Sequence, residues 1–107
     1  MQEIKSLAEL QSLVASKKAV FVDFYATWCG PCKAIAPFVE QKSKENTKVA
    51  FAKVNVDVAV DAAQAYGINA MPTFIGFLSG VHLVPSVRGA DKVGIGNLVT
   101  HLANNVV

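Results

Sequence analysis

The two cysteines of this 107-residue chain, Cys29 and Cys32, stand three positions apart in the segment Trp28-Cys-Gly-Pro-Cys-Lys33. On a helix, residues with this spacing share a face at about 5–6 Å, close to the Cα separation that a disulfide requires. A dithiol placed in this way can open and close a disulfide with little change in the backbone. The spacing therefore predicts thiol–disulfide exchange.

The two sulfur atoms are expected to do different work. Cys29 falls at the start of a predicted helix, where unpaired N–H groups and the helix dipole favour an anion, so we expect it to be the attacking thiolate. Cys32 lies one turn further in and is expected to be less exposed and to attack second. Gly30 leaves room for a partner, and Pro31 suits and stiffens a first helical turn.

A zinc half-site is the alternative interpretation of the cysteines. Structural zinc takes four ligands, and His82 and His101 lie far along the sequence without ligand spacing, so redox chemistry is favoured. Trp28 is expected beside the site, either as ordinary core filling or in direct contact with a substrate.

Asp23 interrupts an otherwise apolar predicted strand, Ala19–Tyr25. A carboxylate in a buried strand costs several kcal/mol unless it is paired or protonated. Lys53, in the neighbouring predicted strand, is the natural partner. Two interpretations remain open. One is structural, with Asp23 on a solvated face or in an ion pair. In the other, the carboxyl has a raised pKa and accepts the proton of Cys32.

The elements that position these residues follow from the patterns along the chain. We predict strands over 2–5, 19–25 and 49–56 and a hairpin of 74–78 with 81–87. A first helix is expected after Ser6, and a second over 29–45 with a kink at Pro37. A short third helix is expected to run from Asp57 to about Tyr66, and a last helix to begin after Asp91. This order predicts a three-layer α/β domain with a mixed sheet. Strand 19–25 is apolar on both faces and is expected at the centre, whereas Pro85 places the last strand at an edge.

The composition indicates one domain over residues 1–107. Apolar residues make up 52% of the chain and the net charge is +2, which gives no reason to expect nucleic acid or a membrane surface as partner. No stretch approaches the ~18 apolar residues of a membrane span. The N-terminal residues carry no signal pattern, and two cysteines cannot form a disulfide framework. These features predict a reducing compartment, the cytoplasm, with an organelle reached through a removed targeting segment as the alternative. We expect the chain to be a monomer.

The whole chain resembles the thioredoxin family. The resemblance rests on residues 22–33, Ala36-Pro37, Lys53–Asp57, Tyr66-Gly67-Ile68, Met71-Pro72-Thr73 and Arg88-Gly89-Ala90. It implies a three-layer thioredoxin-like fold in which four helices flank a five-stranded mixed sheet. It also implies a cis bond between Met71 and Pro72, facing the cysteines.

The resemblance further implies an activity, the reduction of disulfides in other proteins through Cys29 and Cys32. The protein's own disulfide would be recycled by a separate thioredoxin reductase, and no bound cofactor is needed. Asp23 matches the family's buried acid, which is taken to help deprotonate Cys32, and Lys53 matches its partner. The implied substrate-binding surface is apolar and comprises Trp28, Gly30, Pro31, Met71, Pro72, Gly89 and Ala90.

The Gly-Pro spacer resembles that of the reducing members of the family. An isomerase or oxidase of the same fold and a docking module without redox work are the alternatives. Three residues depart from the family pattern. Gly76 interrupts a strand, Pro85 lies in a stretch one residue longer than usual, where we expect a bulge, and Arg88 stands beside the contact surface, where it can bias the choice of partner.

Overall fold

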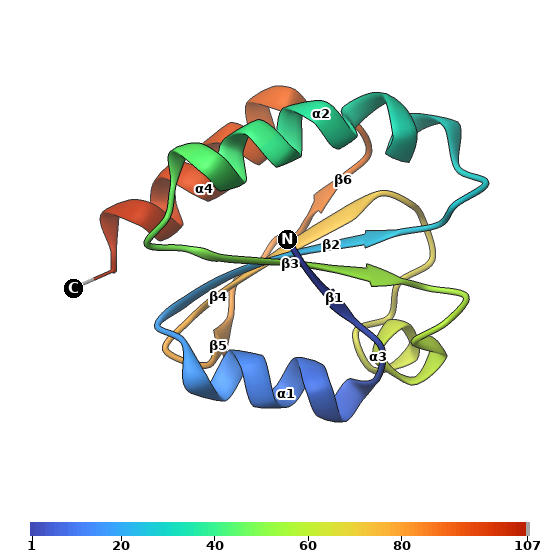
Figure 1. Ribbon diagram of the computed structural model, residues 1–107, viewed down its shortest axis with the longest axis horizontal. Coiled ribbons are helices and arrows are strands. Elements are labelled where there is room, and N and C mark those ends of the chain that lie inside the picture. The colour runs from blue at the N-terminus through green and yellow to red at the C-terminus, as the bar shows by residue number, and fades with distance from the viewer. Residues whose placement is uncertain (107) are drawn as a thin grey trace.

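The computed structural model describes residues 1–106, which form six strands and four helices (Figure 1). The strands are β1 (Gln2–Ile4), β2 (Ala19–Tyr25), β3 (Ala50–Asn55), β4 (Thr73–Leu78), β5 (Val81–His82) and β6 (Val87–Arg88). The helices are α1 (Leu7–Ser16), α2 (Gly30–Glu45), α3 (Val60–Ala65) and α4 (Lys92–Asn104). The predicted order of elements is confirmed.

The strands form one mixed sheet in the order β1-β3-β2-β4-β5, with β6 also paired to β4. Strands β1, β3 and β2 are parallel, β4 is antiparallel to β2, and β5 and β6 are antiparallel to β4. Because parallel neighbours end at the same edge, the loops that follow β2 and β3 lie at one end of the molecule, on the right of Figure 1. The start of α2 lies at this end.

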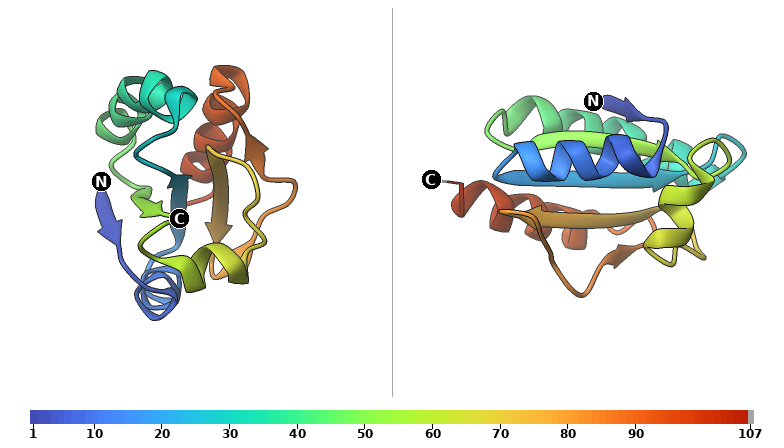
Figure 2. Two further views of the ribbon diagram at one scale, coloured as in Figure 1. Left: turned by 90° about the vertical axis from the view of Figure 1, so that its right-hand side faces the viewer. Right: turned by 90° about the horizontal axis from the view of Figure 1, so that it is seen from below.

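Helices cover both faces of the sheet, with α2 and α4 on one face and α1 and α3 on the other (Figures 1 and 2). The first six residues of β2 are buried, which confirms its central position. Successive side chains of a strand alternate between faces, so Val22 and Phe24 pack towards α1 and α3 while Phe21 packs towards α2 and α4. The same alternation directs Asp23 to the face covered by α2.

The predicted last strand, 81–87, is divided in two. Strands β5 and β6 each pair with β4. The Leu83 N–H still donates to the Gly76 carbonyl of β4 at 2.8 Å, and residues 84–86 then leave the ladder. Pro85 lies in this excursion and has no N–H to donate, which is the physical reason for the break. The edge position of this region is confirmed. The Val84–Pro85 and Met71–Pro72 peptide bonds are both cis.

Side chains cap three of the helices. Ser6, Cys29 and Asp91 each accept a backbone N–H from the first turn of the helix that follows. Helix α2 continues without interruption through Pro37. No helix within residues 1–106 is both long and apolar enough to cross a membrane.

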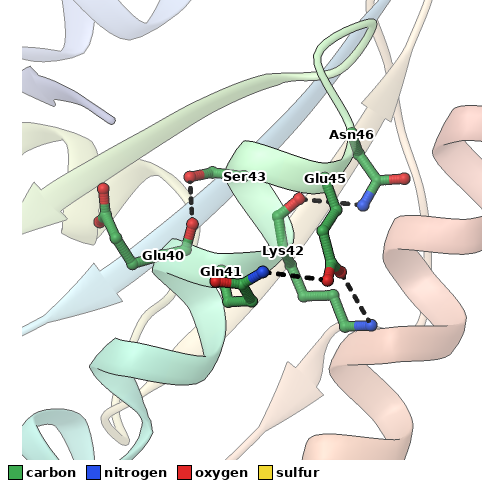
Figure 3. A network of polar contacts seen from close by, with 6 residues as sticks. All are labelled: Glu40, Gln41, Lys42, Ser43, Glu45 and Asn46. Atoms are coloured by element: carbon green, nitrogen blue, oxygen red, sulfur yellow. Dashed lines mark hydrogen bonds and ion pairs between the residues drawn. The ribbon is translucent and has the colours of Figure 1, made fainter.

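The last turn of α2 lies far from the cysteines and is closed by short polar contacts (Figure 3). The Ser43 hydroxyl donates to the Glu40 carbonyl at 2.6 Å. The Asn46 side-chain amide donates to the Lys42 carbonyl at 2.9 Å, and the same carbonyl accepts the backbone N–H of Asn46 at 3.1 Å. The Lys42 ammonium lies 3.6 Å from the Glu45 carboxylate, and an exposed pair of this kind adds at most about 1 kcal/mol.

The glycines of β4 and α4 differ in the space around them. A Cβ on Gly76 would lie 2.7 Å from Cδ1 of Leu98, so glycine at this strand position leaves room for α4 to pack closely. A Cβ on Gly94 would lie 2.5 Å from the Asp91 carboxylate that caps α4. A Cβ on Gly96 would meet no atom within 4 Å.

We therefore expect Gly96→Ala to raise the free energy of unfolding by about 0.5–1 kcal/mol, because alanine restricts the unfolded chain and favours the helix. Gly94→Ala is the matched control in the same helix and should give no gain, since its methyl group displaces the Asp91 cap. Urea unfolding of both variants measures the difference. Equal stabilisation by both would contradict this account of α4.

Candidate active site

The disulfide between Cys29 and Cys32 closes over the first turn of α2. The two Cα atoms are 5.3 Å apart, within the usual range for a disulfide. Cys29 is the N-cap residue, and its sulfur accepts the N–H of Cys32 at 3.2 Å. A negative charge on this sulfur would face that N–H and the positive end of the helix dipole. The geometry therefore favours a thiolate at Cys29.

Exposure does not distinguish the two cysteines. Cys29 is 5% exposed and Cys32 is 7% exposed, so the prediction that Cys32 is the less exposed is wrong. The surroundings of the two residues do differ. The Cys29 sulfur lies 3.7 Å from the Met71 carbonyl oxygen, a packing contact because a disulfide sulfur has no proton to donate. Cys32 lines a cavity on the other side, which Asp23 also lines.

Trp28 is 66% exposed, and its indole N–H donates to the Asp57 carboxylate at 2.9 Å. The core-filling interpretation of Trp28 is therefore wrong, and its ring is available beside the dithiol. Sequence reasoning missed Asp57 as the residue that orients this ring. Its place two residues after the end of β3, whose carboxyl end lies beside that of β2, was the available signal.

The other residues of the predicted contact surface come from three segments. Gly30 and Pro31 are exposed at the start of α2 and flank the cysteines. The Met71 carbonyl contacts the Cys29 sulfur, and Pro72 is buried behind it. The N–H of Gly89 donates to the Pro72 carbonyl at 2.8 Å, and this bond joins the Gly89-Ala90 segment to the Met71-Pro72 loop.

Asp23 is 8% exposed, and within residues 1–106 its Oδ1 atom accepts no hydrogen bond. Burial raises the pKa of this carboxyl to about 7, against the lowering effect of the Lys53 charge and with a smaller raising effect of the Glu3 charge. The solvated-face interpretation of Asp23 is therefore wrong. The carboxyl can take up and release a proton near neutral pH.

Lys53 is the partner of Asp23 in the register of β2 and β3, as predicted, but the carboxylate within ion-pair distance of its ammonium group is that of Glu3. The Lys53 ammonium lies 4.0 Å from Glu3 on β1, so the predicted direct Asp23–Lys53 pair is replaced by a Lys53–Glu3 pair. Glu3 also accepts the Tyr25 hydroxyl at 2.8 Å. Burial and this hydrogen bond raise the pKa of Tyr25 to about 12.

The cavity behind Cys32 has a volume of about 320 Å³ and lies between α2 and the adjoining strands. Asp23, Cys32 and Lys53 line it together, with Lys33 and Glu40 of α2 among the other lining residues. The structure thus brings the second cysteine, the buried carboxyl and the lysine to one space, as the sequence predicted. The sequence did not indicate Glu3 and Tyr25 as the residues next to the Lys53 ammonium, because this contact depends on the pairing of β1 with β3.

The histidines lie apart from the cysteines. His82 is on β5, where its ring meets Tyr66 edge-on and Phe77 at a tilt, with ring centroids 5.5 and 5.6 Å away, while His101 is on α4. Among residues 1–106, no three side chains of the types that bind metals come together to form a metal site. The two cysteines are joined in a disulfide, the bond that thiol–disulfide exchange opens and closes.

Comparison with known proteins agrees with this geometry. The family model named Thioredoxin matches residues 3–101. The chain belongs to the thioredoxin family. It is 48% identical to a thioredoxin-like protein of Fusarium culmorum over 90% of this chain and 85% of that protein, and 44% identical to thioredoxin-1 of Saccharomyces cerevisiae over 87% and 89%. It matches the X-ray structure of Fasciola hepatica thioredoxin with a TM-score of 0.90 at 38% identity, over 95% and 99% of the two chains.

Some of the relatives are much longer. A peptide-N(4)-(N-acetyl-beta-glucosaminyl)asparagine amidase of Caenorhabditis elegans is 45% identical over 91% of this chain, but the match covers only 16% of that protein. The amidase name is therefore not carried over. As a thioredoxin-family member with a Cys-x-x-Cys disulfide, the chain is a thiol–disulfide oxidoreductase of the protein-disulfide reductase type.

The raised pKa of Asp23 makes folding stability depend on pH. Between about pH 4 and pH 7 an unfolded Asp23 has lost its proton while the folded one keeps it, so stability falls as the pH rises through this window. The full effect is about 4 kcal/mol above pH 7. We expect Asp23→Asn and Asp23→Ala to remove this pH dependence and to be more stable than the wild type at pH 8. Urea unfolding from pH 4 to pH 8 measures it, and parallel curves for wild type and variants would contradict the assignment.

The contact between Glu3 and Lys53 yields a second expectation. Glu3→Gln removes a negative charge that raises the Asp23 pKa and frees the lysine to approach Asp23, so the Asp23 pKa should fall below about 7. Tyr25→Phe is the matched control, since it removes a partner of Glu3 but leaves the Glu3 charge in place. Carboxyl carbon NMR titration of the oxidised protein measures the change. An unchanged or higher pKa in Glu3→Gln would show that Glu3 has no electrostatic effect on Asp23.

Proposed function

We propose that the chain reduces disulfides in target proteins with Cys29 as the attacking sulfur and Cys32 as the resolving sulfur. The Cys29 thiolate attacks one sulfur of the target disulfide, a mixed disulfide forms, and the first target sulfur leaves as a thiolate. The Cys32 thiolate then attacks the Cys29 sulfur and releases the second target sulfur. Two electrons pass to the target, and the Cys29–Cys32 disulfide is formed.

Asp23 is proposed to accept the proton of Cys32 before the second attack. The two residues line one cavity, and a carboxyl with a pKa of about 7 is present in both its acid and base forms at neutral pH, which suits a general base. Lys53 is proposed to tune this base by its charge. Its position is set by Glu3, with which it forms the ion pair.

Targets are proposed to dock on Trp28, Gly30, Pro31, Met71, Pro72, Gly89 and Ala90. Two observations support this surface. The Trp28 ring is exposed beside the dithiol. Within residues 1–106, the backbone N–H and carbonyl of Met71 make no backbone hydrogen bond, so both can pair with an extended target segment laid alongside. The surface offers both an apolar contact and backbone partners next to the reacting sulfur.

The proposal includes the setting in which the reaction runs. A dithiol that reduces its targets must itself be kept reduced, which favours the cytoplasm and a separate thioredoxin reductase as the electron donor. The family match over residues 3–101 supports one domain over residues 1–107. We propose that this domain acts as a monomer. No bound cofactor takes part in the steps above.

The observation that carries the proposal is the disulfide at the N-cap of α2, with the Asp23 cavity behind Cys32. Reductase-coupled reduction of insulin by the wild type, Cys29→Ser and Cys32→Ser tests it. We expect turnover by the wild type only. We expect Cys32→Ser to form covalent, reductant-sensitive complexes with target proteins, because its mixed disulfide lacks an internal thiol to resolve it.

Cys29→Ser is the matched control for the trapping experiment and should form no such complexes. In the reduced wild type, limiting iodoacetamide should modify Cys29 before Cys32, as peptide mapping can show. Trapping by Cys29→Ser together with first labelling of Cys32 would reverse the two roles. A folded wild type that reduces no insulin would favour a docking module instead.

A further inference from the structure

A second cavity, of about 530 Å³, lies on the face of the sheet opposite the Asp23 cavity. Its lining includes Asn69, Thr73, His82, Ser86 and Arg88. Thr73 and Arg88 are direct partners across β4 and β6, so their side chains lie on the same face of the sheet. The cavity is therefore built from the loop before β4 and from the excursion that separates β5 from β6.

The side chains that line this second cavity are basic or neutral, and none is acidic. Its lining residues include an arginine and a histidine but no aspartate or glutamate. Arg88 is exposed and takes part in none of the ion pairs found among residues 1–106. The side chains of Asn69 and Ser86 add hydrogen-bond donors. An unpaired guanidinium beside neutral donors is suited to a carboxylate.

Only a few residues separate the second cavity from the Cys29 sulfur. Arg88 precedes Gly89, whose N–H is bonded to the Pro72 carbonyl, and its strand partner Thr73 is two residues from Met71. The Met71 carbonyl is 3.7 Å from the Cys29 sulfur. With a rise of ~3.3 Å per residue and a strand spacing of ~4.8 Å, the Cα atoms of Arg88 and Met71 are about 8 Å apart. An extended target segment covers that distance in about three residues.

We propose that Arg88 and this second cavity form a subsite that binds an acidic side chain of the target, about three residues from the cysteine that Cys29 attacks. The inference rests on the proposed function and adds a specificity-determining residue to it. The subsite would favour targets with aspartate or glutamate near the reacting disulfide. Targets with lysine at that position would be disfavoured by the like charge of Arg88.

Disulfide peptides that differ in one residue provide the test. Two sets carry Glu, Gln or Lys three positions before or after the reacting cysteine. Single-turnover reduction is followed by the fluorescence of Trp28, the single tryptophan, which lies beside the dithiol. In one of the two sets, the wild type should react with the Glu peptide roughly tenfold faster than with the Lys peptide at low salt, and the ratio should shrink as salt screens the charges.

Four variants separate the subsite from a general charge effect. Arg88→Gln should bring the Glu-to-Lys rate ratio close to one, and Arg88→Glu should reverse it. Asn69→Asp, which places a carboxylate in the cavity and leaves Arg88 unaltered, should also remove the preference. Lys48→Glu changes the net charge by as much as Arg88→Glu but lies between α2 and β3, at the far end of the sheet, and should keep the wild-type ratio.

Equal rates of the wild type with all peptides would overturn the subsite while leaving the reductase function in place. Retention of the preference in Arg88→Gln, or its loss in Lys48→Glu, would likewise overturn it. Failure of the wild type to reduce even the Gln peptides would instead contradict the proposed function. The two failures are therefore distinguishable.

Discussion

Strand β2 is the constraint on which the rest of the structure depends. It pairs with β3 over Val20–Tyr25 and with β4 over Ala19–Phe24, and helices cover both of its faces. The carboxyl end of β2 leads to the end of the sheet where α2 begins. Because its side chains alternate between the two faces, Asp23 lies on the face covered by the helix that holds Cys32. One buried strand thus determines both where the dithiol stands and which carboxyl lies behind it.

The burial of Asp23 lowers the stability of the fold but gives the carboxyl a pKa that suits its proposed role as a proton acceptor. A carboxyl at the centre of a packed sheet loses its hydration, and in return its acidity falls into the range where a proton acceptor is useful. Glu3 contributes to this raised pKa because it pairs with Lys53, so that the lysine lies near Asp23 without forming a direct ion pair with it. The site therefore depends on β1, an element that contributes no reacting atom.

Most of the fold could be predicted from the sequence, because the apolar pattern of residues 19–25, the caps Ser6 and Asp91 and the cysteine spacing are local signals. The cysteines, Asp23 and Lys53 were found for the same reason. The rest depends on relations between distant segments. The Lys53–Glu3 contact follows from the register of β1 on β3, and the exposure of Trp28 follows from Asp57 on another loop. No pattern along the chain specifies these contacts before the strands are assembled.

The broken hydrogen-bonding edge formed by β5 and β6 has a consequence for how copies of the protein behave towards one another. An unpaired strand offers a row of N–H and carbonyl groups on which another chain can add, and long edges of this kind lead to aggregates. Here each of these strands is two residues long, Pro85 interrupts the row between them, and the opposite edge, β1, has only three residues. A sheet with so apolar an interior thereby presents no long template at either side, which protects the chain against edge-to-edge association at high concentration.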